Sequence, residues 1–355
     1  MTPLHSNQPL LSVRHLSADF ISPEGSVSHA LEDVSFDVYP GQTLGLVGES
    51  GCGKTTTMMS LMRLLPAAGR ITRGQVIFNG QDLLTLSERE MRAYRWKEMA
   101  MVFQSAMNAL NPVYTIGDQI REAIVQHNLM EAKAADHRVE ELLDLVGIAK
   151  SRRTQYPHQY SGGMRQRAMI AMALACNPKL LFADEPTTAL DVMVQAQVLE
   201  LLKLIQKEFG LAVVLVTHDL GVVAEVCDTV AVMYGGKVAE YGSADQVYNN
   251  PQHPYTQRLL EAFPDLNRPD DKLVSIPGAP PRLNALPPGC RFEPRCHKRI
   301  EECSLISPKL INVSEEGSQQ KAESSTLPSA YRLPPAPRAH YAACHLCTGP
   351  EASFT

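Results

Sequence analysis

Short apolar runs alternate with amphipathic stretches along most of the chain, from residue 11 to about residue 248. Residues 180–183 (LLFA) and 212–217 (AVVLVT) are continuous apolar runs, which favours central strands of a sheet covered on both faces. Between them, apolar residues recur at helical spacing over residues 192–209. A strand, a crossover helix and a second strand make a parallel unit, so the pattern predicts an α/β domain.

Two further regions complete this domain. Residues 43–47 (TLGLV) predict a strand that ends in glycines, and residues 55–65 predict the helix that follows it. Residues from about 91 to 172 are mostly helical in pattern, and we expect a helical subdomain inserted between strands of the sheet. One face of its predicted helices carries Val139, Leu142, Leu143 and Val146.

The composition changes near residue 250. Beyond it lie 16 of the 25 prolines, and five of the eight cysteines fall within the last 66 residues. Each proline removes a backbone donor and restricts the residue before it, so this density prevents long regular structure. We therefore expect an α/β domain over residues 11–250 and an irregular extension rich in cysteine and proline over residues 251–355.

The charge balance excludes one class of partner. With 33 Lys and Arg against 38 Asp and Glu, the net charge is −5, without the basic character expected of a nucleic-acid-binding domain. No run of eighteen apolar residues occurs, and residues 1–11 hold no basic cluster followed by an apolar core. The sequence therefore predicts a cytoplasmic chain without a membrane span and without a nucleic-acid partner.

Residues 48–55 (GESGCGKT) match the phosphate-loop pattern G-x-x-x-x-G-K-[ST] in full, between a predicted strand and a predicted helix. Glycines let successive backbone N–H groups turn toward phosphate oxygens, and the helix N-terminus adds partial positive charge. We expect Lys54 to reach the β- and γ-phosphates and Thr55 to ligate Mg²⁺. Backbone amides do the binding, so the Cys52 side chain is expected to have no catalytic role. The expected nucleotide contacts of this segment are Gly48, Ser50, Gly51, Cys52, Gly53, Lys54, Thr55 and Thr56.

Two other segments suit a triphosphate site. Asp184 and Glu185 directly follow an apolar strand, where Asp184 is expected to hold Mg²⁺ and Glu185 to accept a proton from the attacking water. Ser161 precedes a predicted helix and is followed by Gly162 and Gly163. A serine N-cap with two glycines exposes the first helical N–H groups, which predicts a second anion site.

These motifs, in this order, resemble those of the nucleotide-binding subunit of an ATP-binding cassette (ABC) transporter. The resemblance covers about residues 11–240 and implies a P-loop NTPase cassette with a mixed central sheet and a helical subdomain. It further implies that Gln104, after MVFQ, senses Mg²⁺ and the attacking water and touches the membrane subunit. Asp191 would be the aspartate of the D-loop, and His218 would hydrogen-bond the γ-phosphate. The catalytic set is then Glu185, His218 and Gln104, with Thr55, Gln104 and Asp184 at Mg²⁺.

Phe20, in the segment HLSADF, matches the position of the aromatic residue that stacks on adenine in this family. A phenylalanine of the core is the alternative interpretation of the same residue. The resemblance also implies that Ser161 reaches across to the nucleotide of a partner, so that two cassettes close face to face around two ATP molecules. The expected partners are a second ATPase subunit of different sequence, two transmembrane permeases and an extracytoplasmic substrate-binding protein.

The clustered cysteines predict a metal centre. Cys290, Cys296, Cys303 and Cys344 offer four thiolates, and disulfides are disfavoured in the cytosol. Zinc and an iron–sulfur cluster both accept such a set, and free thiols are the third alternative. The surrounding IPGAPP, PPGCRFEPRC and AACHL resemble the C-terminal region of oligopeptide, dipeptide and nickel importer ATPases, some of which carry a [4Fe–4S] cluster. That resemblance favours the cluster and selects Cys344 over Cys347.

The leading hypothesis is an ATPase subunit on the cytoplasmic face of the inner membrane that drives a bacterial importer of di- or oligopeptides. A nickel importer subunit and a soluble cassette ATPase acting on DNA or ribosomes are the alternatives. DNA-repair relatives insert long coiled coils, whereas Gln104 and Ser161 are only 57 positions apart. The membrane-subunit contact is expected around Gln104 and the following SAMNALNP segment.

Overall fold

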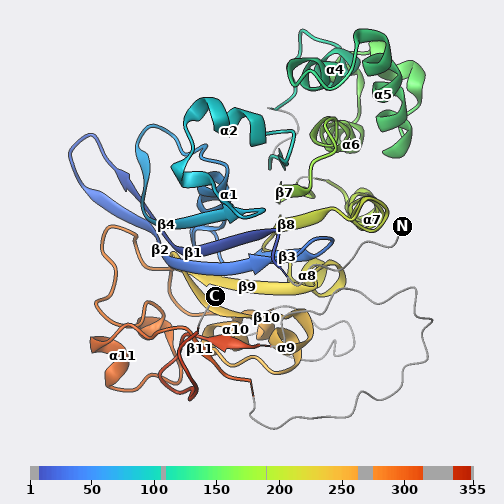
Figure 1. The fold of residues 1–355 in the computed structure, drawn as a ribbon. Helices are drawn as coiled ribbons and strands as arrows, with labels where there is room; N and C mark the ends of the chain where they lie inside the picture. Colours follow the sequence, from blue (N-terminus) through green and yellow to red (C-terminus); the bar gives the residue numbers. More distant parts are fainter. Residues whose placement is uncertain (1–7, 105–108, 189, 263–274, 315–338, 353–355) are drawn as a thin grey trace.

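The computed structural model describes residues 8–104, 109–188, 190–262, 275–314 and 339–352. Its centre is a mixed sheet that runs across the molecule (Figure 1). In spatial order the strands of this main sheet are β11 (Ile311–Asn312), β12 (Tyr341–Ala342), β10 (Lys237–Ser243), β9 (Thr229–Tyr234), β3 (Thr43–Val47), β8 (Ala212–Val216), β7 (Leu180–Asp184) and β6 (Met99–Val102).

The middle of the main sheet is parallel and buried on both faces. Strands β9, β3, β8, β7 and β6 pair in parallel, and every residue of β3, β7 and β8 is buried. The crossover helix α7 (Val192–Phe209) joins β7 to β8 and begins at Asp191, whose carboxylate accepts the N–H of Val194 at 3.0 Å. The parallel unit, the strand at 43–47 and the helix at 192–209 predicted from the apolar pattern are confirmed.

A second, antiparallel sheet lies beside the first on the side of α1 and α2 (Figure 1). Its order is β2 (Val27–Val38), β1 (Leu11–Ile21), β4 (Gly69–Phe78) and β5 (Gln81–Asp82). The apolar face of this sheet and the adjoining face of the main sheet share one core, with Leu11, Phe36, Leu44 and Phe182 fully buried. The nearby helices are α1 (Lys54–Leu61), η1 (Leu83–Thr85) and α2 (Glu88–Tyr94).

Three helices, α4 (Ile116–Gln126), α5 (Ala132–Leu145) and α6 (Gly162–Ala173), pack together beyond β6 and β7 (Figure 1). The predicted apolar face of Val139, Leu142, Leu143 and Val146 is buried among them. The range expected to be helical, about 91–172, also contains β6, because its apolar residues pair with β7. Short turns of 3₁₀ helix precede α6 at η2 (Lys150–Thr154) and η3 (Pro157–Gln159).

The segment after residue 250 is tied into the main sheet. Strand β12 pairs with β10, and β11 pairs with β12. Glu240 of β10, fully buried, accepts hydrogen bonds from the N–H of His253 at 2.9 Å and from the ring of His340 at 2.7 Å. The described residues of this segment therefore share the sheet of the preceding domain. Its helices are α10 (Pro254–Glu261), η4 (Glu293–Arg295) and α11 (Glu302–Leu305). Just before it lies α9 (Ala244–Asn249), and α8 (Leu220–Val226) contacts α9, α7 and β3.

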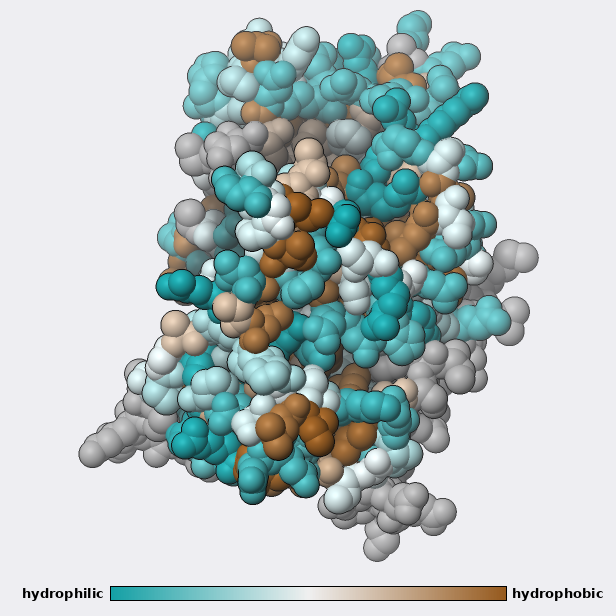
Figure 2. All heavy atoms as spheres, turned by 90° about the vertical axis from the view of Figure 1, so that its left-hand side faces the viewer, coloured by the Kyte–Doolittle hydropathy of each residue, from teal (hydrophilic) through white to brown (hydrophobic). Residues whose placement is uncertain are grey.

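No helix in the described ranges has the length and apolar character that crossing a bilayer requires. On the face shown in Figure 2, small apolar groups are separated by hydrophilic side chains.

Candidate functional site

The phosphate loop joins β3 to α1 along a backbone path that favours glycine. Gly48 and Gly53 have φ of 143° and 108°. A Cβ on Gly48 would lie 2.2 Å from the carbonyl oxygen of Met233, and one on Gly53 would lie 3.0 Å from that of Ala30. Glycine therefore lets the loop approach β9 and β2 closely, while Ser50 remains exposed at its outer side.

Lys54, the first residue of α1, is tied to the backbone of the loop. Its Nζ donates hydrogen bonds to the carbonyl oxygens of Gly48 at 2.6 Å and Glu49 at 3.0 Å. Cys52 is buried beside it, and burial raises the pKa of its thiol, which therefore stays neutral. Gly51 and Thr55 are exposed, and Thr56 is half-buried.

Thr55 and Asp184 meet across the site. The Thr55 hydroxyl donates to Asp184 Oδ1 at 3.3 Å, which joins the start of α1 to the end of β7. Burial raises the pKa of the Asp184 carboxyl, which is only 4% exposed. A hydroxyl and a carboxylate are the oxygen ligands that Mg²⁺ accepts, so these two side chains fit that ion. Gln104, the third residue expected at Mg²⁺, instead contacts Glu185.

Glu185 is the centre of a hydrogen-bonded group. Its Oε2 accepts from Gln104 Nε2 at 2.8 Å and from the Thr188 hydroxyl at 2.9 Å, and its Oε1 lies 3.2 Å from His218 Nδ1. Burial raises the pKa of this carboxyl, but hydrogen bonds led by those from His218 and Thr188 outweigh burial and lower it overall. Glu185 is therefore a carboxylate at neutral pH. The structure thus brings together the three residues predicted to be catalytic.

Ser161 starts α6, and its hydroxyl accepts the N–H of Met164 at 3.3 Å, as an N-cap does. Gly163 is in close contact with α7, because a Cβ there would lie 2.5 Å from Val194. Gly162 lies beside Leu190. Among the hydrogen bonds of the described residues, none joins residues 161–163 to the phosphate loop of the same chain.

Phe20 lies near the end of β1, half-buried, and its ring covers Gly69, where a Cβ would meet it at 2.8 Å. This contact fits a packing residue, and the adenine contact stays a prediction. The SAMNALNP segment expected at the membrane subunit begins in residues 105–108, which lie outside the described residues.

Two parts of the site were missed by sequence reasoning. Thr188 follows Glu185 by three residues, a spacing that lets its hydroxyl turn back to the carboxylate. Tyr255 and Arg295 contact Glu49 of the phosphate loop from beyond residue 250. No local pattern marks these distant residues.

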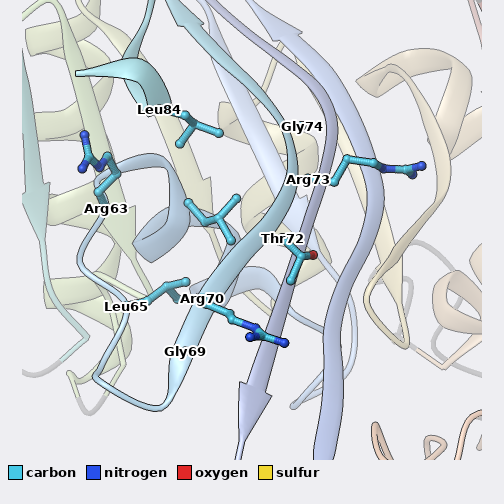
Figure 3. Close-up of a pocket in the computed structure, with 9 residues that line it drawn as sticks. Arg63, Leu65, Gly69, Arg70, Thr72, Arg73, Gly74 and Leu84 are labelled. Atoms are coloured by element: carbon cyan, nitrogen blue, oxygen red, sulfur yellow. The ribbon is translucent and has the colours of Figure 1, made fainter. Parts of the chain in front are cut away.

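A groove of about 430 Å³ lies along β4, away from this site (Figure 3). Although arginines line it, the Arg63 and Arg73 side chains point in opposite directions. Arg63 donates to the carbonyl oxygens of Leu83 and Leu86, and Arg73 pairs with Asp33. These arginines are used within the fold and do not converge on a ligand.

The cysteines of the extension lie near one another as free thiols. Burial, with smaller contributions from the nearby Cys303, Cys344 and Cys296, raises the pKa of Cys290 to about 11. Cys290 also donates its N–H to the carbonyl of Cys303 at 2.7 Å. Yet within the described ranges no three His, Cys, Asp or Glu side chains are grouped so as to hold a metal ion. The structure thus places these thiols in one region of the extension and gives no support to the predicted metal centre.

Comparison with protein families gives two matches. Residues 31–188 match the family described as ABC transporter, and residues 239–303 match the one described as oligopeptide/dipeptide transporter, C-terminal region. The second match begins inside β10 and ends at Cys303. The two family resemblances noted in the sequence are confirmed.

Among curated proteins, the chain is 50% identical over 304 residues to the dipeptide transport ATP-binding protein DppD of Bacillus subtilis, covering 85% of this chain and 90% of that protein. It is 48% identical over 302 residues to the oligopeptide transport ATP-binding protein OppD of Escherichia coli, covering 84% and 89%. A solved dimeric ATP-binding cassette bound to ADP and phosphate matches 66% of this chain and 98% of its own, with a TM-score of 0.60 and 27% identity. The predicted P-loop cassette fold is confirmed.

Proposed function

This chain belongs to the ATP-binding, ATP-hydrolysing subunits of ABC transporters, and we propose that it powers the import of di- or oligopeptides into a bacterial cell. Peptides are proposed as the substrate because residues 239–303 match the oligopeptide/dipeptide transporter C-terminal region. The names of the relatives in Bacillus subtilis and Escherichia coli support the same substrate class. Two permeases and a substrate-binding protein would complete the importer, with this chain on the cytoplasmic face of the membrane.

The site residues support hydrolysis by a water molecule that Glu185 deprotonates. The lowered pKa keeps the Glu185 carboxylate ready to accept that proton, and Gln104 and His218 hold it in place. Thr55 and Asp184 would hold Mg²⁺, which offsets negative charge on the phosphates. Lys54 would exchange its two carbonyl partners for phosphate oxygens.

Closure would require a second cassette. Ser161 and its glycines make no hydrogen bond to the phosphate loop of their own chain, which agrees with a role at the partner's nucleotide. The solved cassette with ADP and phosphate is itself dimeric. Binding of ATP would hold two subunits together, and loss of the γ-phosphate would release them.

The test of this function is affinity purification of the full-length chain from gently solubilised membranes of its native cells. We expect two multispanning permeases and a second ATPase of different sequence to copurify, and the reconstituted complex to import a radiolabelled di- or tripeptide. Recovery with ribosomes or DNA would contradict the proposal. Transport of nickel without transport of peptide would contradict the proposed substrate class.

We also propose that Cys290, Cys296, Cys303 and Cys344 bind a [4Fe–4S] cluster that staples the extension. The mutual proximity of the thiols supports this, because Cys296, Cys303 and Cys344 each lie close enough to Cys290 to raise its pKa, and a [4Fe–4S] cluster is bound by four cysteine thiolates. A segment with so little hydrophobic core of its own is stabilised by a metal centre that links its parts. Anaerobically purified protein should be brown and contain equal amounts of iron and acid-labile sulfide. Colourless protein with stoichiometric zinc would instead assign a zinc site, and metal-free protein would contradict both.

A further inference from the structure

Arg295, from the segment beyond residue 250, forms an ion pair with Glu49, the second residue of the phosphate loop. The Arg295 guanidinium donates from both terminal nitrogens to the two carboxylate oxygens of Glu49, at 2.6 and 3.0 Å. This bidentate arrangement fixes direction as well as distance. The two residues are 246 positions apart, so the contact joins two parts of the chain that could otherwise move independently.

The arginine side of this pair is rigid. Its side chain is only 5% exposed, its Nε donates to the carbonyl of Pro277 at 2.7 Å, and one terminal nitrogen also reaches the Tyr234 hydroxyl at 3.2 Å. Burial lowers the pKa of Arg295, but hydrogen bonds to Glu49 and Tyr234 outweigh it and keep the group charged. An arginine held by several hydrogen-bond partners acts as a fixed support for Glu49.

Glu49 passes this constraint to the catalytic lysine. Its N–H donates to the Tyr255 hydroxyl at 2.9 Å, so that N–H is engaged by α10. Its carbonyl oxygen accepts Nζ of Lys54 at 3.0 Å. The carboxylate, the N–H and the carbonyl of one residue are thus all engaged, two by residues beyond position 250 and one by Lys54.

A second arginine of the same segment supports the loop from β9. Arg291, which is buried, donates to the carbonyl of Gly235 and pairs with Glu32 of β2. The adjacent Gly236 donates its N–H to the carbonyl of Cys52 at 2.9 Å. The loop is therefore supported through Glu49 at one end and through Cys52 near the other.

We infer that Arg295 is a positioning residue for ATP: through Glu49 it sets the phosphate loop and Lys54 in the conformation that receives the phosphates. The role rests on ATP binding by the phosphate loop and is independent of which substrate is transported and of what the cysteines hold. A loop without this support has to be ordered by the nucleotide itself, and that ordering weakens binding. The chemical step, for which Glu185 directly after β7 is the proposed base, is left unchanged.

The experiment compares the full-length Arg295→Gln, Glu49→Gln and double variants for affinity toward a fluorescent ATP analogue and for the KM and kcat of ATP hydrolysis. We expect each single variant to raise Kd and KM by roughly tenfold with kcat within about twofold. The double variant should be no weaker than the weaker single variant, since both remove the same interaction. Arg295→Lys, which keeps the charge and loses the bidentate geometry, should recover part of the affinity.

The matched control is Arg299→Gln, four residues away, because Arg299 is 66% exposed and pairs at 3.5 Å with Glu293. It should leave Kd and KM unchanged. If folded Arg295→Gln protein melts at a lower temperature but binds ATP normally, Arg295 only docks the extension and the inference is wrong. Additive losses in the double variant would also overturn it. Should Arg295→Gln fail to fold, Glu49→Gln and Arg295→Lys decide the question. Because binding is measured on the isolated chain, a failure to transport peptide leaves this result intact.

Discussion

Glu185 is held in place by its backbone as well as by its side chain. It has a φ of 43°, an unfavourable value for a residue with a side chain, and its N–H donates to the carbonyl of Val216 at 2.9 Å. Three side chains fix the carboxylate in addition. A carboxylate so constrained loses little further freedom when water and ATP arrive, which is what a general base requires.

Replacing Glu185 with Gln should separate binding from chemistry. The amide keeps the shape of the side chain but accepts no proton, so we expect ATP to bind and hydrolysis to fall roughly a hundredfold or more. ATP should then hold the protein as a closed dimer. Phosphate release and size-exclusion chromatography with ATP measure the two effects. Normal turnover in this variant would show that another group is the base.

Thr188 should control the pH at which activity is lost in acid. Its hydrogen bond helps to lower the pKa of Glu185, so removing it in Thr188→Val raises that pKa toward its ordinary value. Glu185, the proposed base, then becomes protonated at a higher pH, and the acid limb of the kcat profile should shift upward. Thr72→Val, on exposed β4, is the control that leaves the profile in place. An unshifted acid limb in Thr188→Val would argue against Glu185 as the titrating group.

At the scale of elements, strand β10 anchors the segment beyond residue 250 through buried polar groups. The Glu240 carboxylate accepts hydrogen bonds from the His340 ring and from the N–H of His253. The His253 ring in turn accepts the N–H of Tyr255 at 3.0 Å and so caps α10. This capped helix presents Tyr255 to the phosphate loop. The phosphate loop is therefore in direct contact with a helix that is remote from it in sequence.

Burial of His253 makes this anchor sensitive to acid. Burial lowers the pKa of its imidazole from 6.5 to about 4. Between these values the unfolded chain binds a proton that the folded chain does not, so stability is lost as the pH falls from 6.5 toward 4. The full loss is about 3 kcal/mol, taking 1.36 kcal/mol for each unit of pKa. In His253→Asn, where Asn retains the capping role, the melting temperature should depend less on pH between 7 and 5. An unchanged dependence would place the acid sensitivity elsewhere.

The local elements could be predicted from the sequence because their signals are local. The apolar run of β3, the helical spacing of α7 and the phosphate-loop pattern each lie within one short stretch of sequence. The pairing of Glu49 with Arg295 could not be predicted, since an arginine in a proline-rich segment carries no mark of its distant partner. For the same reason the sequence did not predict that Tyr341 and Ala342 extend the main sheet at β10.

At the scale of the whole molecule, the phosphate loop and the Ser161 segment lie in separate parts of the chain, and no hydrogen bond among the described residues joins them. The phosphate loop, Asp184 and Glu185 gather at the ends of parallel strands of the main sheet, where ligands of α/β folds bind. Ser161 starts a helix of the separate helical group. Two copies, or this chain and a related subunit, would each supply what the other lacks.

Ser161→Asp tests this division. Asp also caps helices, so α6 should remain folded, but its negative charge would repel the γ-phosphate held by a partner. Because the phosphate loop belongs to the same chain, we expect the Kd for ATP on the monomer to stay within about twofold. In a Glu185→Gln background, ATP should no longer trap the dimer, as light scattering would show. Ser243→Asp, at the N-cap of α9, is the matched control and should leave the trapped dimer intact. If Ser161→Asp instead weakens ATP binding to the monomer, Ser161 faces the nucleotide of its own chain and the composite site is wrong.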